Sequence, residues 1–264
     1  GAYSGMTLGE FISACGNAVV SPDYDGTCFP LLIKFIDACD RLSIQVHPDD
    51  DYARRVEKAS GKTEMWYIVE ADEGAGIYLG FKRDVTQAEY EQAIADKTLT
   101  ELLNFFEVKA GECYFIPSGT IHAIAEGCLI CEIQQNSNLT YRVFDYGRVG
   151  ADGKPRELHV QRALDVSVTK PYTLPCGQVG EVKAIAGGSL RTLAECEKFA
   201  TWECTLQGKA SIPADIRCVL CLEGSATLAC DCCEDIVVPA GASVYIPEGL
   251  QCTIHGNARV LWIK

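Results

Sequence analysis

The amino-acid sequence predicts a mainly β protein made of two small antiparallel β-barrels of one type, with a few short helices. An internal repeat is the first reason: residues 109–124, KAGECYFIPSGTIHAI, match residues 239–254, PAGASVYIPEGLQCTI, in outline. Each copy contains a glycine turn, a strand that reaches Ile-Pro and a second glycine turn, which suits small antiparallel barrels. We therefore expect two domains, residues 1–165 and residues 166–264, with a long connection around residues 150–167.

Along the first domain, short helices are expected to alternate with strands. Residues 7–16 begin with a capping-box pattern and end in glycine, which predicts a short helix. Residues 29–48 predict two β segments separated by a polar turn, the second of which ends at Pro48. Residues 50–60 then predict another short helix.

Strands are expected to dominate the remainder of the chain. Residues 63–71 and 76–81 predict two strands that pair across the loop between them. Residues 86–106 show helical periodicity with acidic residues early, which predicts one or two helices. In the second domain, residues 217–224 and 226–230 predict two strands around a Glu-Gly turn.

Composition narrows the range of functions. The 264 residues include 48% hydrophobic and 22% charged residues, as in ordinary soluble globular proteins. The net charge of −13 disfavours a nucleic-acid partner, and an anionic substrate would need a local basic site against this field. No apolar run reaches the about 18 residues of a membrane span, and the first residues show no secretory signal. We therefore expect a cytoplasmic enzyme without nucleic-acid or membrane partners, whose oligomeric state the sequence leaves open.

The 15 cysteines raise the question of their redox state. Without a secretory signal, reduced thiols are expected, several of them inside apolar runs where cysteine packs as a small core residue. One cluster resembles a zinc site built from CxxC pairs: Cys218, Cys221, Cys230, Cys232 and Cys233. On a strand, however, positions i and i+3 face opposite sides, so Cys218 and Cys221 could not easily share a metal ion. Buried or incidental thiols are therefore favoured over a structural zinc site.

Four polar residues of the first domain are candidates for a common site. Gln45 and His47 lie two residues apart on a predicted strand, so their side chains point to one face. Glu64 opens the next strand, and His122 follows the Ile-Pro-x-Gly turn. In a small antiparallel barrel these strands can bring the four side chains to one interior point. Taken singly, each residue also has an ordinary structural explanation, such as a hydrogen-bonded histidine or a surface acid.

The repeat provides an internal comparison for this site. Where the first copy has Glu64 and His122, the second copy has Arg217 and Cys252. The difference favours a site in the first domain and a scaffold role for the second, although simple drift after duplication could produce the same pattern. Two imidazoles, a carboxylate and an amide oxygen suit Zn²⁺, and suit Fe²⁺, Mn²⁺ or Co²⁺ less well. One or two positions would stay open for water or substrate oxygens.

Four ordered segments of the chain resemble type I mannose-6-phosphate isomerases in their short bacterial form. The segments are FPLLIKFIDACDRLSIQVHPDD, GKTEMWYIVEA, IPSGTIHAI and EIQQNSNLTYRVFDYGR. The similarity runs through most of residues 1–165 and is weaker in the second domain, where AGASVYIPEG carries most of it. The resemblance implies two cupin-type (jelly-roll) β-barrels, with metal ligands in the first barrel alone. It also implies a zinc-dependent aldose–ketose isomerase, with one Zn²⁺ per chain, that interconverts mannose 6-phosphate and fructose 6-phosphate.

The resemblance further implies roles for individual residues. The zinc ligands of the family match the four residues that spacing selected: Gln45, His47, Glu64 and His122. Arg142 matches the family's arginine and would stabilise an enediol(ate) or position the substrate. Lys62 would transfer a proton or contact the substrate, because partial burial beside a metal can lower a lysine's pKa; a structural salt bridge is the alternative. Ser43 and Arg148 are expected phosphate contacts, with a surface arginine as the alternative for Arg148.

The sequence departs from the family pattern in two respects. Family members usually begin with a further segment that carries a Trp-Gly element, whereas this sequence starts at GAYSGMTLGE. Longer relatives have an aspartate and a histidine where this chain has Asn138 and Gly61. Any part of those two groups in proton transfer therefore cannot be carried over.

Two other functions compete with the isomerase. One is a non-catalytic sugar-binding cupin that keeps the metal, and the other is a cupin oxygenase with Fe²⁺ in the same pocket. A pure binding protein has no need for Lys62, Glu64 and Arg142 together, which favours the isomerase. A glutamine ligand beside an Arg/Lys pair also suits sugar-phosphate oxygens better than dioxygen.

Overall fold

The computed structural model describes residues 2–149, 153–231 and 234–264, and the chain forms two compact units. The first unit is Pro30–Val179, and the second unit combines Gly1–Phe29 with Gly180–Lys264. This division differs from the expected one at residue 165. Residues 176–177, beyond the expected boundary, pair with a strand of the first unit. The N-terminal residues contact the rest of the second unit, where the hydroxyl of Tyr245 donates a hydrogen bond to the carbonyl of Val19 at 2.7 Å.

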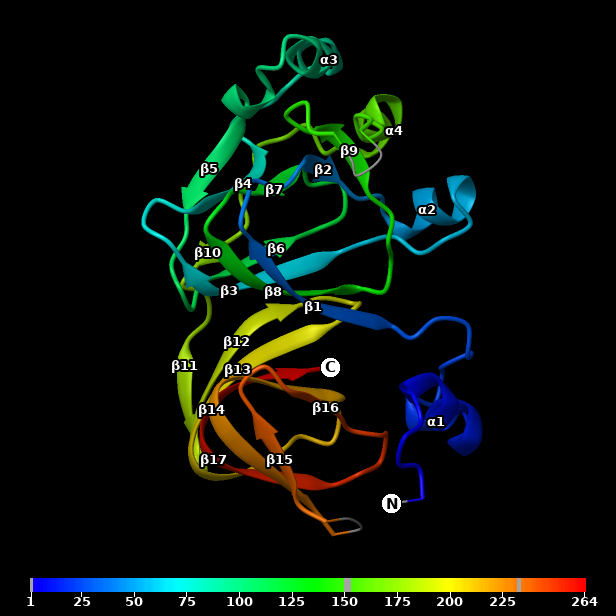
Figure 1. The fold of residues 1–264 in the computed structure, drawn as a ribbon, viewed down its shortest axis with the longest axis vertical. Coiled ribbons are helices and arrows are strands. Elements are labelled where there is room, and N and C mark those ends of the chain that lie inside the picture. Colours follow the sequence, from blue (N-terminus) through cyan, green and yellow to red (C-terminus); the bar gives the residue numbers. More distant parts are fainter. Residues whose placement is uncertain (1, 150–152, 232–233) are drawn as a thin grey trace. The chain divides into compact units, whose positions relative to one another are not determined.

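The first unit contains two five-stranded antiparallel sheets, which form two layers in Figure 1. The first sheet has the order β1 (Leu31–Ala38), β8 (Cys128–Gln135), β3 (Glu64–Ala71), β6 (Cys113–Ile116) and β10 (Cys176–Gly177). The second sheet has the order β5 (Leu103–Glu107), β4 (Gly76–Phe81), β7 (His122–Ile124), β2 (Ile44–Val46) and β9 (Tyr141–Phe144). β9 is therefore an end strand of the second sheet.

Apolar residues cover both faces of the second sheet. One buried cluster combines residues of both sheets, among them Trp66, Leu79 and Ile130, so it fills the space between them. Another cluster joins the opposite face of the second sheet to the helices of the unit. These helices are α2 (Asp50–Val56), α3 (Gln87–Ala95), α4 (Val160–Val166) and the 3₁₀ turn η2 (Leu99–Glu101). A polar side chain that points between the two sheets is therefore shielded from water on both sides by apolar residues.

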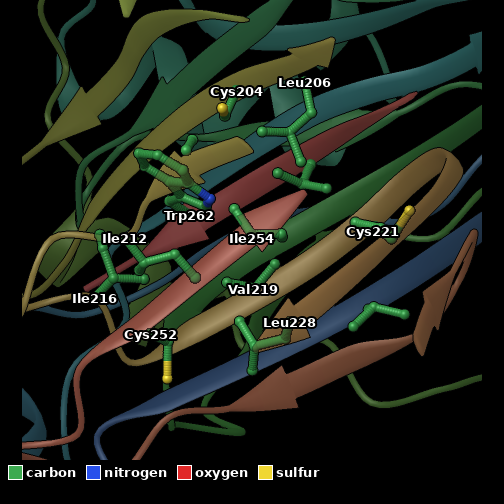
Figure 2. Close-up of a cluster of buried hydrophobic side chains, with 14 of the residues drawn as sticks. Cys204, Leu206, Ile212, Ile216, Val219, Cys221, Leu228, Cys252, Ile254 and Trp262 are labelled. Atoms are coloured by element: carbon green, nitrogen blue, oxygen red, sulfur yellow. The ribbon is translucent and has the colours of Figure 1, made fainter. Parts of the chain in front are cut away.

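The second unit is a seven-stranded antiparallel sheet with its own core. Its main path is β11 (Val182–Ile185), β12 (Gly188–Glu195), β13 (Ala200–Ser211), β17 (Cys252–Ile263), β14 (Cys218–Cys230) and β15 (Ile236–Pro239), and β16 (Ser243–Tyr245) pairs with β14. The helices are α1 (Leu8–Cys15) and the 3₁₀ turn η1 (Asn17–Val19). Figure 2 shows the core, in which Trp262 packs among residues such as Leu206 and Ile254.

Several sequence predictions are confirmed. The chain is mainly β, with a few short helices. Thr7 and Glu10 form the predicted reciprocal capping box of α1, which ends at Gly16. Asp49 caps α2 directly after Pro48 and accepts a hydrogen bond from the Tyr52 backbone N–H. Local capping signals therefore located the starts of both helices correctly, whereas α2 ends at Val56, before the expected residue 60. The closure of the sheets into two jelly-roll barrels stays a prediction.

The predicted pairing of residues 63–71 with residues 76–81 is wrong. β3 pairs with β6 and β8 of the first sheet, whereas β4 pairs with β5 and β7 of the second sheet. Both strands are largely buried, and periodicity reports the burial of a strand but not its partner. The chain therefore crosses from one layer to the other between them.

The helical prediction for residues 86–106 is only partly correct. Helix α3 and the turn η2 form as expected, but the chain then enters strand β5 at Leu103. In β5, an edge strand beside β4, Leu103 packs into the helix-covered cluster and Phe106, on the opposite face, packs against the cluster between the sheets. Contact with β4 therefore outweighs the helical periodicity of this short stretch.

The expected turn at Glu223 and Gly224 is a β-bulge inside one continuous strand, β14. The pairing of β14 with β17 shifts between Cys221 and Glu223, and Gly224 has a φ of 75°. A Cβ at Gly224 would lie 2.3 Å from the carbonyl oxygen of Asn257, so the position requires glycine. Within the expected long connection at residues 150–167, residues 160–166 form helix α4.

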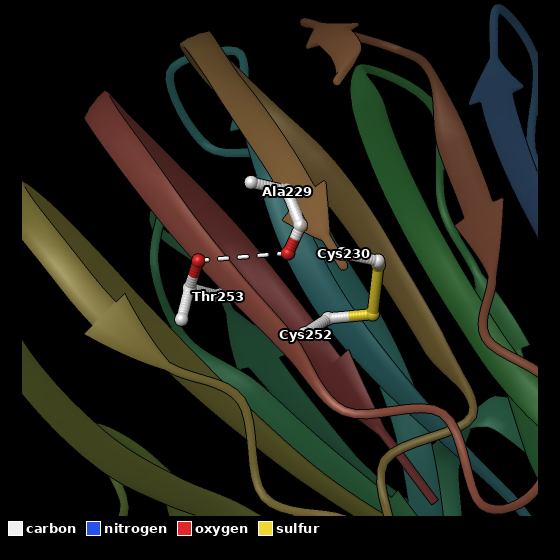
Figure 3. The surroundings of a disulfide bond; sticks show 4 residues. All are labelled: Ala229, Cys230, Cys252 and Thr253. Atoms are coloured by element: carbon white, nitrogen blue, oxygen red, sulfur yellow. Dashed lines mark hydrogen bonds between the residues drawn. A yellow bond between two sulfur atoms is a disulfide. The ribbon is translucent and has the colours of Figure 1, made fainter. Parts of the chain in front are cut away.

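Cys230 and Cys252 form a disulfide between neighbouring strands, which Figure 3 shows beside the hydrogen bond from Thr253 to the Ala229 carbonyl. The two residues are direct partners in the pairing of β14 with β17, and their Cα atoms are 4.6 Å apart. The expectation of reduced thiols is therefore wrong for this pair. Cys232 and Cys233 of the proposed cysteine cluster lie outside the described residues.

Of the helices that the structure describes, none is long and apolar enough to span a bilayer.

Candidate metal centre

Side-chain alternation along the second sheet of the first unit places three polar residues between the sheets. On β2, Ile44 and Val46 pack into the helix-covered cluster, so Gln45 between them faces the opposite way. Gln45 is the direct cross-strand partner of His122 on β7 and of Arg142 on β9. Directly opposed residues share one face of a sheet, so these three side chains form a row that points toward the first sheet.

The first sheet contributes the acid of the site. Glu64 opens β3, and Trp66 and Ile68, which have the same parity, lie in the cluster between the two sheets. Glu64 therefore points into the same space as Gln45 and His122. His47 follows β2 directly and is also buried. The sequence-predicted group is thus assembled from both sheets of the first unit.

The two imidazoles and the carboxylate converge on one point. Ligand atoms of His47, Glu64 and His122 all lie within 4.8 Å of one another. The Nε2 atom of His122 is 3.4 Å from Glu64 Oε1, and the Nε2 atom of His47 is 3.7 Å from Glu64 Oε2. The side-chain amide nitrogen of Gln45 lies 3.4 Å from His122 Nε2. Rotation of that amide by half a turn would present its oxygen instead, because the two ends have nearly the same shape.

Backbone carbonyls orient both imidazoles. The Nδ1 atom of His47 lies 2.7 Å from the Leu139 carbonyl, and that of His122 lies 2.8 Å from the Thr120 carbonyl. A carbonyl can only accept, so each Nδ1 carries the proton and each Nε2 keeps a lone pair directed at Glu64. Metal-ligating histidines are held in the same way, with the remote nitrogen bonded to a carbonyl or carboxylate.

Burial dominates the electrostatics of the three groups. Burial lowers the pKa of His122 to about 4, and burial together with the charge of Lys62 lowers the pKa of His47 well below its ordinary value. Burial and the neighbouring Glu132 raise the pKa of Glu64 to about 7. Both carboxylate oxygens of Glu64 are buried and accept no aligned hydrogen bond from the described residues. Glu64 has the ammonium of Lys62 as an ion-pair partner at 2.8 Å, and its carboxylate beside two neutral imidazole lone pairs fits a divalent cation.

Lys62 lies at the edge of this cluster as a buried cation. Its Nζ is 2.8 Å from Glu64 Oε2 and 3.2 Å from His47 Nε2. Burial opposes the charged form, but the carboxylates of Glu64 and Glu132 outweigh it and raise the pKa of Lys62. The lowered pKa expected from the sequence is therefore wrong, because two acids face this lysine.

Sequence reasoning missed a second ion pair beside the site. Lys34 on β1 lies 2.8 Å from Glu132 on β8, and Glu132 also accepts a hydrogen bond from the Trp66 indole at 3.1 Å. Burial opposes the ionisation of Glu132, but Lys62 and Lys34 hold its pKa below the usual range. A signal was available, since Lys34 and Glu132 each interrupt an apolar strand on its inward face.

Arg142 extends the row of polar side chains beyond Gln45. Its guanidinium donates one hydrogen bond to the Glu157 carbonyl at 3.1 Å, while its Nε is buried and has no partner among the described residues. Burial and the nearby Arg156 lower the pKa of Arg142. An unpartnered buried N–H of a guanidinium is a donor available to an anionic oxygen.

The two expected phosphate contacts, Ser43 and Arg148, differ in their surroundings. Ser43 is buried, and its hydroxyl lies 3.5 Å from the Gln45 side-chain oxygen. Arg148 is engaged by Asp145 at 2.5 Å and by the Arg41 carbonyl at 2.7 Å, so it is not a free surface arginine. Arg156 also pairs with Asp145.

The equivalent positions of the second unit hold no such group. Arg217, the counterpart of Glu64, pairs with Glu248, and Cys252, the counterpart of His122, is in the disulfide with Cys230. Among the described residues, one group of three or more histidine, cysteine or acidic side chains could hold a metal ion, and it is the group of the first unit. Cys230 of the cysteine cluster, which the sequence disfavours as a zinc site, is in a disulfide with Cys252.

Fold and site together define a class: mainly β proteins with a candidate metal centre buried between two sheets. Residues 1–74 match the family model described as phosphomannose isomerase type I, catalytic domain. The chain is 37% identical over 232 residues to a putative mannose-6-phosphate isomerase, YvyI, of Bacillus subtilis (strain 168), covering 86% of this chain and 72% of that protein. The crystal structure of the mannose 6-phosphate isomerase from Bacillus subtilis superimposes with a TM-score of 0.89 at 32% identity, covering 100% of this chain and 83% of that one. The chain therefore belongs to the type I mannose-6-phosphate isomerase family.

Coverage differs among relatives. The probable mannose-6-phosphate isomerase GmuF of Bacillus subtilis (strain 168) is 39% identical over 191 residues, which are 72% of this chain. The match spans 60% of the length of GmuF.

Proposed function

We propose that the chain is a zinc-dependent aldose–ketose isomerase that interconverts mannose 6-phosphate and fructose 6-phosphate through an enediol(ate). The observation that carries this proposal is the buried convergence of His47, Glu64 and His122 beside Gln45, in a member of this family. The relatives named above are described as mannose-6-phosphate isomerases, which supports the same substrate pair.

Gln45, His47, Glu64 and His122 would hold one Zn²⁺ per chain. Two nitrogen and two oxygen donors suit Zn²⁺ better than the soft-thiolate metals do, and the unprotonated Nε2 atoms of both histidines support this choice. When bound, the ion would polarise substrate oxygens and offset the negative charge that develops on them.

Arg142 would stabilise the charge that the isomerisation creates. Proton transfer between C1 and C2 of the open-chain sugar passes through an enediol(ate), whose oxygen carries negative charge. The buried, unpartnered Nε of Arg142 is a donor that can face this oxygen without losing another hydrogen bond. Lys62 is our candidate for proton transfer or for contact with a substrate hydroxyl, because its ammonium group lies in the same buried cluster.

Arg148 and Ser43 would bind the phosphate group. Three neighbouring guanidinium groups, of Arg142, Arg148 and Arg156, face the two carboxylates of Asp145 and Asp40, so this group leaves one positive charge. In a chain with a net charge of −13, such a local excess of positive charge is what a phosphate monoester requires. The Ser43 hydroxyl, next to Gln45, could donate to a phosphate or sugar oxygen.

A coupled assay tests the reaction. Mannose 6-phosphate is supplied and fructose 6-phosphate is measured, with the metal-loaded protein and after treatment with a chelator. We expect turnover that the chelator abolishes and added Zn²⁺ restores. Absence of metal-dependent turnover would overturn the proposal. Sugar-phosphate binding without turnover would replace it by the metal-containing, non-catalytic sugar-binding protein.

A pair of variants tests the location of the metal. His122→Ala should lose bound zinc, whereas serine replacements of Cys230, Cys232 and Cys233 should keep it. Zinc content is measured by elemental analysis after gel filtration, and circular dichroism checks that each variant is folded. The reverse result, zinc retained in His122→Ala and lost with the cysteines, would move the site to the second unit.

A further inference from the structure

Arg142 lies on β9, an end strand of the second sheet. A single residue outside the sheet forms hydrogen bonds with both the backbone N–H and the backbone carbonyl of Arg142. β9 pairs with β2 along one edge only. At its other edge, the Arg142 backbone N–H donates to Nδ1 of His159 at 3.3 Å, and the His159 backbone N–H donates to the Arg142 carbonyl at 2.8 Å. His159 therefore closes the open edge of the strand at the position that carries the arginine.

The same segment also holds the guanidinium. Arg142 Nη1 donates to the carbonyl of Glu157 at 3.1 Å, two residues before His159. An arginine side chain has many rotamers, and its ordering costs about 2 kcal/mol, so such contacts are needed to keep one geometry. The segment thus fixes the start and the end of the Arg142 side chain, while its Nε stays without a partner.

The His159 ring is not used by the helix that it begins. His159 is the N-cap residue of α4, yet its side chain makes no capping hydrogen bond. Its Nε2 lies 3.9 Å from the Glu157 carboxylate, which favours the proton on Nε2 and leaves Nδ1 as an acceptor. An N-cap position normally favours Ser, Thr, Asp or Asn. The imidazole here instead accepts from the neighbouring strand.

We propose that His159 is a positioning residue that sets the placement of Arg142 at the metal centre. Its role rests on the proposed isomerase function, in which Arg142 faces the charge that develops on the substrate. Loss of the Nδ1 acceptor leaves the Arg142 N–H unpaired at the sheet edge and lets β9 shift relative to β2. Displacement of a catalytic cation by a fraction of an ångström lowers the rate of the chemical step more than substrate affinity.

Three substitutions separate this role from general stability. His159→Leu removes the acceptor, His159→Asn keeps an oxygen near the Nδ1 position, and Gln161→Ala changes an exposed residue of the same helix without touching Arg142. We expect kcat to fall about tenfold in His159→Leu, as for loss of one hydrogen bond at the site. KM should change by less than about threefold, His159→Asn should recover most of the rate, and Gln161→Ala should match the wild type.

A double-mutant cycle and hydrogen exchange complete the test. In an Arg142→Ala background, His159→Leu should cause no further loss of kcat, because its effect passes through the arginine. The Arg142 amide should exchange faster in His159→Leu and stay protected in His159→Asn, a readout that does not depend on activity. Additive losses of kcat, or an unchanged amide, would overturn the proposal. A wild-type protein without isomerase activity would instead overturn the proposed function, and the exchange data would still decide whether His159 holds Arg142.

Discussion

At the scale of single residues, the metal centre follows from the two-residue period of β-strands. Gln45, His122 and Arg142 are each flanked by buried apolar neighbours that face the helices. Alternation then forces each polar side chain to face the other sheet. The same rule turns Glu64 inward from β3. The cost of burying these groups is offset only when they find partners, which explains why they gather at one point.

Substitution of the buried carboxylate tests whether Glu64 is a metal ligand. Glu64→Gln should lower zinc affinity by at least about tenfold, as expected for loss of a charged ligand. In the metal-free protein the change should also lower stability, because it removes the nearer of the two acids that face the buried ammonium of Lys62 and leaves only Glu132 at 3.7 Å. Zinc titration and thermal melting with a chelator measure the two effects.

Glu70→Gln is the matched control, since Glu70 is an exposed acid on the same strand, β3. It should leave the zinc affinity unchanged. Equal zinc affinity in Glu64→Gln and the wild type would remove Glu64 from the metal centre.

Asp145 gives the first unit a specific dependence on pH. Burial opposes its ionisation, but hydrogen bonds from Arg156 and Arg148 hold its pKa below the usual range. The folded state therefore favours the carboxylate. Its contribution to stability is complete above the unfolded pKa of about 4 and is lost as the pH falls through the lower folded value.

Thermal melting between pH 2 and pH 6 should show this contribution. At pH 6 the melting temperature of Asp145→Asn should lie below that of the wild type. The corresponding loss in the free energy of unfolding is about 2 kcal/mol. The difference should shrink as the pH falls toward 2, because the wild-type carboxyl is then also neutral. A constant difference across this range would show that the ion pairs with Arg148 and Arg156 do not stabilise the fold.

At the scale of whole elements, local signals succeeded at the ends of helices and failed at the partners of strands. The helices that follow Thr7 and Asp49 begin where the sequence predicts them, because a cap is a contact within one turn. The strands β3 and β4 lie in different sheets, although they are neighbours in sequence. The Glu-Gly pair at residue 223 forms a bulge, since β17 continues alongside β14 on both sides of it.

The disulfide between β14 and β17 should stabilise the second unit. It closes a loop with a sequence separation of 22 residues, which corresponds to about 3 kcal/mol in the chain-entropy model. Reduction, or the double substitution of Cys230 and Cys252 by serine, should lower the urea midpoint accordingly. Alkylation and mass spectrometry establish the redox state of each sample.

Cys39→Ser is the control, because Cys39 is an exposed thiol of the first unit. Its urea midpoint should equal that of the wild type. If oxidised and reduced samples unfold at the same urea concentration, the disulfide contributes nothing to stability.

At the scale of the whole molecule, a repeated architecture carries one candidate centre. The two units share the repeated motif, yet the second has an ion pair at Arg217 and a disulfide at Cys252 where the first has ligands. Arg217 and Cys252 thus each form a structural contact of their own, with Glu248 and with Cys230. This supports a division between a metal-binding unit and a scaffold.

Metal binding should therefore stabilise one unit selectively. A ligand that binds only the folded state adds about 4 kcal/mol when its free concentration is 1,000 times Kd. Removal of zinc should accelerate hydrogen exchange in β2, β3 and β7 and leave β13, β14 and β17 unchanged. Equal acceleration in both sets of strands would contradict a centre confined to residues 30–179.

The sequence alone was sufficient for the class of fold, the repeat, and the three residues that converge in the candidate metal centre, His47, Glu64 and His122. These properties are local or periodic: a cap, an alternation of polar and apolar side chains, a ligand set at a fixed spacing. The contacts of Lys34, Glu132 and His159 became visible only in the folded chain. Each depends on which strands lie side by side and in what register, and that choice is set by many weak contacts between residues far apart in sequence. The pKa of Lys62 reversed its expected direction for the same reason, since the acid that joins Glu64 in raising it comes from another strand.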